Sequence, residues 1–267
     1  SAGTISVDGA DVTAMDREQL QDYRRHRVSM VFQHYGLFPH YTVLDNAAYG
    51  LKTGGVPEAE RREKALEALE TVGLAGWEDY YPHSLSGGMQ QRVGLARALA
   101  TDADILLMDE AFSALDPLIR ADMQGILLDL QSELHKTIVF ITHDLDEALR
   151  IGDDIAILRD GNLVQQGSSQ DIVLNPADEY VADFTKDINR ARVLTLGTLS
   201  HNEPSVDGIV LDSTLTLEQA MNDLAASEKE AINVTRDGQM IGQVTMRDMI
   251  YAASRVKAGD GDTVTYR

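Results

Sequence analysis

The sequence has no cysteine among its 267 residues, and this absence excludes disulfide bonds and thiolate metal sites. It is compatible with a reducing cytoplasm. No apolar run approaches the length of a membrane span, and no secretory leader is visible. We therefore expect a soluble chain, or one that is held at a membrane through a partner.

Basic residues are also scarce, with 23 Lys and Arg against 43 Asp and Glu, which gives a formal net charge of −20. So acidic a surface repels phosphate backbones, and we expect no nucleic-acid partner. The simplest interpretation of the acidity is solubility or a salty habitat. Hydrophobic residues make up 43% of the chain, which is enough for a core, and the length allows one large domain and a small one.

A third absence is the phosphate-binding motif G-x-x-x-x-G-K-[ST], which occurs nowhere in the chain. Residues 85–99 read LSGGMQQRVGLARAL, so that a serine and two glycines open a helix. Residues 105–117 read ILLMDEAFSALDP, an apolar strand that ends in two carboxylates. Free backbone N–H groups at a helix start bind anions, and carboxylates at a strand end suit Mg²⁺ and an activated water. Together the two runs indicate ATP chemistry.

The larger part of the chain is typical of an α/β fold with a parallel sheet. Strands at 105–108 and 137–142 are apolar on both faces, as buried parallel strands are. The helical pattern between them predicts a strand–helix–strand crossover. We also expect a turn at Asp8-Gly9, a strand at 28–32 and a hairpin about Asp160-Gly161. Helices are expected at 58–72, 87–100 and 178–186.

A polar joint at residues 187–192 separates this large domain, residues 1–186, from a small α+β module at 193–257 and a tail at 258–267. Within the module, residues 193–199 and 208–210 look extended. Helices are expected at 216–227 and 248–253, with strands at 231–234 and 240–244 about a turn that contains Asp237-Gly238.

Three of the predicted strands end in polar side chains, and open α/β sheets bind ligands at the carboxyl ends of their strands. Asp109 is suited to hold Mg²⁺, and Glu110 is suited to orient the attacking water. His143 could touch a γ-phosphate as a neutral imidazole. Gln33 also ends a strand. Taken alone, each of these residues would be interpreted as a solvated strand end or a plain loop residue. The LSGG run upstream of Asp109 and Glu110 and the SALD run downstream favour the functional interpretation.

At the LSGG run, Ser86, Gly87 and Gly88 lack bulk, so a phosphate could approach their backbone closely. The purely structural alternative is that Ser86 only caps the helix, with Gln90 in its first turn. The SALD run from Ser113 to Asp116 can likewise be interpreted without a function, as the N-cap region of the next helix.

Four strings carry a resemblance to the ABC-transporter ATPases: VFQHYGLFPHYTVLDNAAYGL at 31–51, LSGGMQQRVGLARALA at 85–100, ILLMDEAFSALDPLIR at 105–120 and TIVFITHDLDEALRIGDDIAIL at 137–158. The resemblance covers residues 1–186 and implies a P-loop NTPase-type domain, N-terminally incomplete, with a parallel sheet and a helical subdomain. It is nearest to importers of quaternary amines such as glycine betaine, proline betaine and choline. Ala111 stands where the family commonly has proline.

The resemblance also implies roles. Glu110 would activate water, His143 would sense the γ-phosphate, and Gln33 would touch Mg²⁺ and water and couple to a membrane permease through residues 33–40. Asp109 would hold the Mg²⁺ of the bound ATP. The groups implied to contact ATP held by a second copy, in a head-to-tail dimer, are Ser86, Gly87, Gly88, Gln90 and Asp116.

GQVTMRDMI at 242–250 resembles one CBS module, in which Thr245 and Asp248 often face an adenosine ribose. A helix cap, or a module for packing and dimerisation, is at least as good an interpretation of this pair.

The function that we expect is ATP hydrolysis for quaternary-amine import, on the cytoplasmic face of the membrane and only indirectly in contact with an outer substrate-binding protein. The alternatives are a soluble ABC ATPase of DNA repair or translation, a non-catalytic regulatory subunit, and an importer of another small solute. The phosphate loop is expected before Ser1, and residues 1–267 alone are expected to be inactive.

Overall fold

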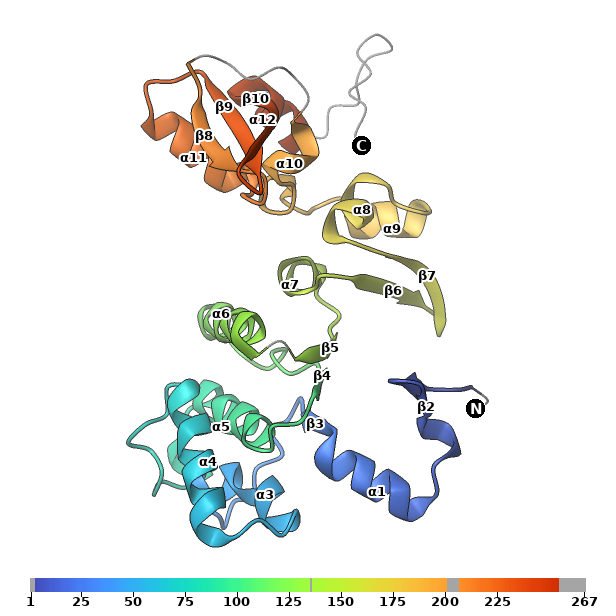
Figure 1. Ribbon diagram of the computed structural model, residues 1–267, viewed down its shortest axis with the longest axis vertical. Helices are drawn as coiled ribbons and strands as arrows, with labels where there is room; N and C mark the ends of the chain where they lie inside the picture. The colour runs from blue at the N-terminus through green and yellow to red at the C-terminus, as the bar shows by residue number, and fades with distance from the viewer. Residues whose placement is uncertain (1–2, 135, 201–206, 255–267) are drawn as a thin grey trace. The chain divides into compact units, whose positions relative to one another are not determined.

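The computed structural model describes residues 3–134, 136–200 and 207–254. The chain divides into two compact units, Ser1–His143 and Asp144–Arg267 (Figure 1). The joint expected at 187–192 lies within the second unit, and the tail expected at 258–267 lies outside the described residues, so the domain boundaries drawn from the sequence stay predictions. Among the helices that the structure describes, none is both long and apolar enough to cross a membrane.

The first unit opens with a small hairpin of β1 (Ser6–Val7) and β2 (Ala10–Asp11), which pair antiparallel. Asp8 and Gly9 join them with φ values of 50° and 80°, so the predicted turn is confirmed. A short 3-10 helix, η1 (Val12–Ala14), follows. Then comes α1 (Arg17–His26), whose start is fixed by a reciprocal capping box.

The centre of the first unit is a parallel sheet in the order β3-β4-β5, formed by Val28–Val31, Ile105–Asp109 and Thr137–Ile141. α6 (Pro117–Leu134) connects β4 to β5. The predicted strand–helix–strand crossover is therefore confirmed. In a parallel sheet the carboxyl ends of all strands lie at the same edge, which here gathers the segments that follow Val31, Asp109 and Ile141.

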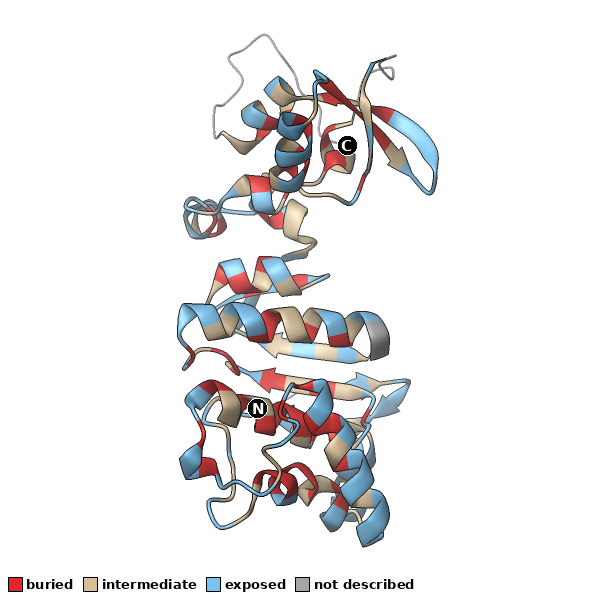
Figure 2. Cartoon of the chain, turned by 90° about the vertical axis from the view of Figure 1, so that its left-hand side faces the viewer, coloured by how far each residue is buried: buried red, intermediate tan, exposed pale blue. Residues whose placement is uncertain are grey.

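The expectation that this sheet is buried on both faces is wrong for one face. Val31 and Met108 on one face are 0% and 1% exposed, whereas Val139 and Ile141 on the other face are 47% and 56% exposed. Figure 2 shows exposed residues on these strands beside buried ones. The difference arises because side chains alternate across a strand, and the residues that the structure describes cover one face more fully than the other.

The chain between β3 and β4 forms a helical layer. It consists of α2 (Val43–Ala47), α3 (Tyr49–Thr53), α4 (Glu58–Thr71), η2 (Pro82–Ser84) and α5 (Gly87–Ala100). α5 packs against the other α-helices of this layer and against β3, and it buries Val93, Ala96 and Ala100 as its spacing predicts. α4 confirms the helix expected at 58–72, and Gly73 ends it with a φ of 73°.

The second unit contains two separate apolar clusters. The first includes Leu145, Ile157 and Ile172. It is formed by α7 (Leu145–Ile151), the hairpin of β6 (Ile155–Arg159) and β7 (Asn162–Gly167), α8 (Ser169–Leu174) and α9 (Glu179–Phe184). The predicted Asp160-Gly161 hairpin is confirmed.

The second cluster is built on a sheet in the order β10-β9-β8, formed by Gln239–Thr245, Ala231–Arg236 and Ile209–Asp212. α11 (Leu217–Ala226) links the parallel pair β8 and β9, and α12 (Met246–Ala253) follows the antiparallel hairpin. Leu217, Ile232 and Met249 fill this core. These elements confirm the α+β pattern expected from the sequence.

The extended segment expected at 193–199 is wrong. The chain there forms η3 (Arg190–Arg192) and the short helix α10 (Leu196–Leu199). The leucines at 194 and 196 imitate a strand pattern, but one helical turn carries Leu196 and Leu199 into the same core, where they are 0% and 4% exposed. Burial of the leucines therefore decides the local structure.

Candidate functional site

Three polar side chains meet at the carboxyl edge of the parallel sheet. Gln33 Nε2 donates a hydrogen bond of 2.8 Å to Glu110 Oε2, and His143 Nδ1 lies 3.4 Å from Glu110 Oε1. Gln33 and His143 each come two residues after a strand, and Glu110 directly follows β4. The structure thus brings together three of the four residues that the sequence singled out at strand ends, although their roles stay predictions.

The backbone of Glu110 is held in an unusual conformation. Its φ is 44°, in the left-handed region that residues other than glycine rarely adopt. Its N–H donates to the carbonyl of Ile141 at 2.9 Å. Its own carbonyl accepts from the backbone N–H of Ser113 at 3.1 Å and from Ser113 Oγ at 2.9 Å. These bonds to a neighbouring strand and to the next turn fix the backbone from which the carboxylate extends.

Asp109 lies exposed at the last position of β4, in register with Ile141. Within the described residues, no group of three or more His, Cys, Asp and Glu side chains forms a preformed metal site. Mg²⁺ usually takes one or two carboxylates and keeps water and phosphate oxygens as its other ligands. Asp109 supplies a carboxylate and Gln33 an amide oxygen, which are ligand types that such a site uses, and a magnesium site at these residues stays a prediction.

Ser86 caps α5 by accepting a hydrogen bond from the backbone N–H of Met89 at 3.3 Å. Packing explains the two glycines that follow. A Cβ on Gly87 would lie 2.8 Å from the hydroxyl of Tyr35, and a Cβ on Gly88 would overlap Ile119 of α6. Packing therefore favours small residues here, most strongly at Gly88, whereas a phosphate on this helix start stays a prediction.

Gln90 and Asp116 make local bonds. Gln90 Nε2 donates to the carbonyls of Pro82 and Leu85 at 3.0 and 3.2 Å, which holds the turn before α5. Asp116 Oδ1 accepts from the backbone N–H groups of Leu118 and Ile119, both at 3.2 Å, and so caps α6. In the part of the chain that the structure describes, no hydrogen bond joins either side chain to Glu110. This is compatible with groups that act on another subunit.

Two residues that the sequence analysis missed shape the loop after Gln33. Arg97 of α5 donates to the carbonyls of Gly36 and Tyr35 at 2.6 and 3.0 Å, and burial lowers the pKa of its guanidinium. Asn46 is fully buried, and its amide binds both the N–H and the carbonyl of Phe38, at 2.8 and 3.1 Å. The signal available in the sequence for Asn46 was a neutral polar residue in a short helix that is apolar apart from Asp45.

The same loop carries a cluster of rings. Phe38 lies 4.3 Å from Tyr49 and 5.4 Å from Tyr41 between ring centroids. Lys52 Nζ lies 5.3 Å from the centroid of the Tyr41 ring. The segment that begins at Gln33 is thus tied to α5 by Arg97 and to the helical layer by these rings.

In the second unit, Thr245 and Asp248 satisfy each other. Asp248 Oδ2 accepts from the backbone N–H and from the hydroxyl of Thr245 at 2.9 and 2.7 Å, and Thr245 Oγ1 accepts from the N–H of Asp248 at 3.3 Å. The helix-capping interpretation of this pair is confirmed, and nucleotide binding stays a prediction.

Comparison with known proteins is decisive for the family. A model of the ABC transporter family matches residues 1–113. A trimethylamine N-oxide transport system ATP-binding protein of Ruegeria pomeroyi is 48% identical over 91% of this chain and 71% of its own length. The chain belongs to the ABC transporter ATP-binding proteins. Its parallel sheet with surrounding helices is the ATPase fold of that family.

Two other relatives are longer than this chain. A glycine betaine transport ATP-binding protein of Bacillus subtilis is 50% identical over 98% of this chain and 60% of its own length. A glycine betaine/carnitine transport ATP-binding protein of Listeria monocytogenes is 57% identical over 73% of this chain and 49% of its own length. This ABC chain therefore spans between about half and three-fifths of the length of these relatives.

Solved structures give the same fold. The ATP-binding cassette MJ0796, in a dimeric post-hydrolysis state bound to ADP and Pi, matches with a TM-score of 0.57 and 34% identity over 63% of this chain and 74% of that chain. The cbiO1 protein of Clostridium perfringens matches with a TM-score of 0.60 and 27% identity over 66% of this chain and 70% of that chain.

Proposed function

We propose that the whole protein hydrolyses ATP to energise ABC-type import of a quaternary amine such as glycine betaine or choline. The observation that carries this proposal is the meeting of Gln33, Glu110 and His143 at one sheet edge, in a member of the ABC family. The proposal concerns the whole protein because residues 1–267 contain no G-x-x-x-x-G-K-[ST] motif for the phosphates of ATP.

The proposal assigns a role to each residue at this edge. Glu110, whose backbone is fixed by Ile141 and Ser113, orients and polarises the attacking water. His143 contacts the γ-phosphate, and Gln33 connects this site to the loop that carries Phe38. Asp109 and the amide oxygen of Gln33 would hold Mg²⁺, which would neutralise phosphate charge when bound.

We propose a head-to-tail dimer for the LSGG and SALD groups. Ser86 and Gly87 are exposed at the start of α5, where backbone N–H groups and the helix dipole favour an anion. Gln90 and Asp116 order the turns that precede α5 and α6. Their partner is ATP on a second copy, and the dimeric state of the MJ0796 cassette supports this arrangement.

The class of transported solute is proposed from the names of the relatives. Their names specify glycine betaine, carnitine, trimethylamine N-oxide and choline, all of which carry a methylated nitrogen. An Fe(3+) import ATP-binding protein of Rhizobium etli is 44% identical over 71% of this chain, which keeps another small solute as the alternative. The subunit would lie on the cytoplasmic face of the membrane, with residues 33–40 against the permease and an outer substrate-binding protein reached only through that permease.

We further propose that the β10-β9-β8 sheet and its helices form a CBS-like module. The support is the parallel β8-α11-β9 unit followed by a hairpin and α12. Because Thr245 and Asp248 already satisfy each other, packing or dimerisation explains them without a ligand.

The test is uptake by cells that lack the gene. Labelled glycine betaine, choline and trimethylamine N-oxide should each be measured at high osmolarity, with ferric iron as the control solute. We expect uptake of at least one methylated amine to be lost and to return with the wild-type gene. Unchanged uptake of all three amines would refute the proposed solute class, and loss of iron uptake alone would favour the alternative.

A further inference from the structure

Both oxygens of the Glu110 carboxylate are approached by side chains of the same chain. Gln33 Nε2 donates to Oε2 at 2.8 Å, and His143 Nδ1 lies 3.4 Å from Oε1. The side chain of Glu110 is 32% exposed, whereas that of His143 is 71% exposed. The carboxylate proposed to activate water is thus partly covered by the loop residue Gln33.

A carboxylate accepts the proton of water through an oxygen lone pair, and an amide N–H that already points at that oxygen competes for the same position. Gln33 in this arrangement therefore restrains Glu110. For hydrolysis to proceed at full rate, the Gln33 amide has to leave Glu110 Oε2 or turn so that its oxygen faces the water.

Ser113 holds the same amide from the other side. Gln33 Nε2 also donates to Ser113 Oγ at 3.3 Å, and Ser113 Oγ donates its own hydrogen to the carbonyl of Glu110 at 2.9 Å. Because that hydrogen is used, Oγ presents lone pairs to Gln33. The two hydrogens of the Gln33 amide thus have two acceptors, Glu110 and Ser113.

Gln33 and Glu110 are held by different contacts. Glu110 is fixed through its backbone to Ile141 and Ser113. Gln33 leads instead into a loop with two successive left-handed residues, Tyr35 and Gly36, with φ values of 54° and 57°. Arg97 and Asn46 tie this loop to helices of the same unit, so a displacement of those helices would reach Gln33.

We propose that Ser113 is a positioning residue that holds Gln33 on Glu110 and restrains hydrolysis until Gln33 is withdrawn. This inference rests on the proposed ATPase function and deepens it, because it assigns a resting state to the same site. The hydroxyl of Ser113 matters as an acceptor for Gln33, and its methylene group has no part in the restraint.

The test compares Ser113→Ala and Ser113→Thr in the protein expressed from its own gene and reconstituted with its permease. We expect the Ser113→Ala variant to raise ATP hydrolysis in the absence of solute about threefold to tenfold, the worth of one hydrogen bond. KM for ATP and the solute-stimulated kcat should stay near wild type. Ser113→Thr keeps the hydroxyl and should restore the low basal rate.

Ser132→Ala is the matched control. Ser132 Oγ donates to the carbonyl of Asp129, three residues earlier, at 2.8 Å, as Ser113 Oγ does to Glu110, but it lies exposed on α6. We expect no change of the basal rate for this variant. An unchanged or lowered basal rate for Ser113→Ala, or equal effects of Ala and Thr at position 113, would overturn the restraint.

A measurement without ATP separates this inference from the proposed function. The side-chain amide protons of Gln33 should be followed by NMR in the full-length protein without nucleotide. We expect their shifts to differ from those of a free glutamine and to move toward them in the Ser113→Ala variant. Free-glutamine shifts in the wild type would overturn the inference even if ATP is hydrolysed. Displaced shifts in a protein that hydrolyses no ATP would refute only the proposed function.

Discussion

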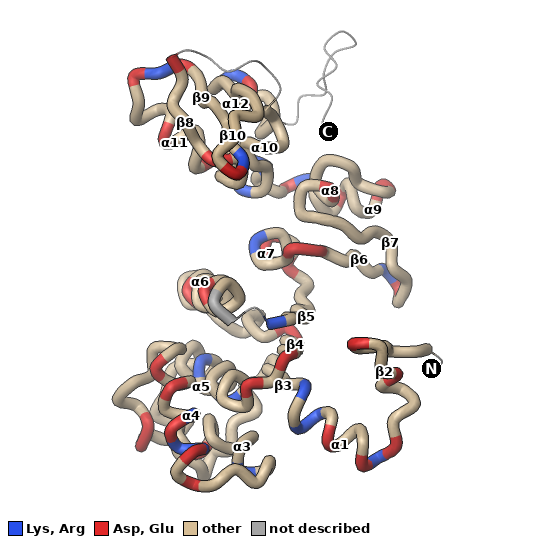
Figure 3. The backbone as a smooth tube through the Cα atoms, in the orientation of Figure 1, with Lys and Arg blue, Asp and Glu red and all other residues tan. Residues whose placement is uncertain are grey.

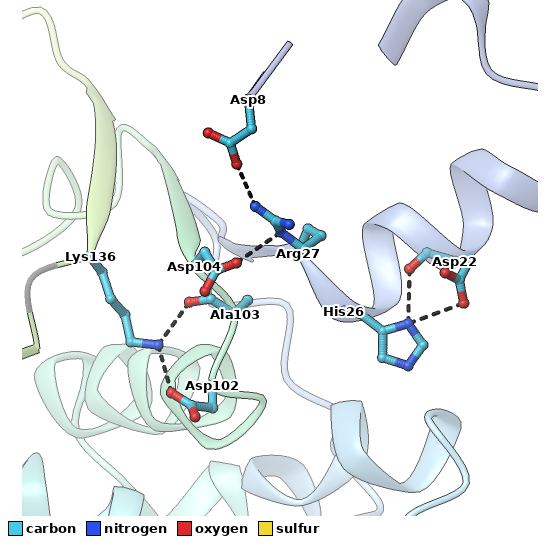
Figure 4. Close-up of polar contacts among 8 residues, drawn as sticks. All are labelled: Asp8, Asp22, His26, Arg27, Asp102, Ala103, Asp104 and Lys136. Atoms are coloured by element: carbon cyan, nitrogen blue, oxygen red, sulfur yellow. Dashed lines mark hydrogen bonds and ion pairs between the residues drawn. The ribbon is translucent and has the colours of Figure 1, made fainter. Parts of the chain in front are cut away.

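The two edges of the β3-β4-β5 sheet, formed by the amino ends and the carboxyl ends of its strands, differ in how their acidic side chains are paired. At the amino edge, Arg27 Nε lies 2.8 Å from Asp104 Oδ2, and Arg27 Nη2 lies 2.5 Å from Asp8 Oδ2 (Figure 4). Lys136 Nζ donates to Asp102 Oδ1 and to the carbonyl of Ala103 at 2.7 and 2.8 Å. The residues that precede the three strands thus pair cations with acids.

At the carboxyl edge the acids have no such partner. Among the described residues, no Lys or Arg forms an ion pair with Asp109 or Glu110, and Glu110 is approached by the amide of Gln33 and the imidazole of His143. The charge is uncompensated in a chain that is already rich in acids (Figure 3). Charges that are already paired need no further ligand. The unpaired carboxylates of Asp109 and Glu110 would instead be completed by a cation and phosphates. The comparison therefore predicts different consequences for substitutions at the two edges.

The largest effect is expected for Glu110→Gln in the full-length protein. The change keeps the shape but removes the charge that orients water, so hydrolysis should fall by about 10²–10⁴-fold. ATP binding should survive, and ATP-bound dimers should accumulate. Steady-state hydrolysis and gel filtration with ATP measure the two outcomes. Hydrolysis near the wild-type rate would remove Glu110 from this role.

Much of this contrast could be predicted from the sequence. Apolar runs that end in Gln33, Glu110 and His143 gave the carboxyl edge, because parallel strands place their ends together. Ser113 could not be assigned as a bridge, because its bond to Gln33 spans 80 residues and depends on a left-handed turn at Glu110. The segment near Leu196 was misjudged because short apolar patterns fit a strand or one helical turn equally well.

A second prediction concerns the loop that leaves the carboxyl edge. Phe38→Asp should weaken docking to the permease at least about tenfold, because a charge replaces a ring in contact with Tyr49. Basal hydrolysis should persist. Co-purification with the permease and an ATPase assay measure the two. Phe184→Asp, at an exposed ring of α9, is the control and should dock normally. Simultaneous loss of docking and hydrolysis in the Phe38 variant would indicate a folding defect instead.

A third prediction extends the comparison to the second unit, where the carboxylate of Asp248 already accepts hydrogen bonds from Thr245. Asp248→Ala should cost about 1 kcal/mol of unfolding free energy, as the loss of a helix cap does. Asp171→Ala removes the same kind of capping box from α8 and should cost a similar amount. Chemical denaturation measures both. Saturable NMR shifts at Thr245 with adenine nucleotides, abolished only by Asp248→Ala, would show a ligand site there.

The smallest effect is expected at the amino edge, for Asp104→Asn. Arg27 and Asp104 are 43% and 64% exposed, and exposed ion pairs contribute about 0–1 kcal/mol. The loss should shrink further at about 1 M salt, where charges are screened within about 3 Å. Denaturation at low and high salt measures this loss of stability. ATP hydrolysis should stay within about twofold of wild type, because Asp104 lies at the opposite end of β4 from Glu110. A tenfold fall in hydrolysis without a change in stability would mean that both edges serve the chemistry, and the division of labour between them would fail.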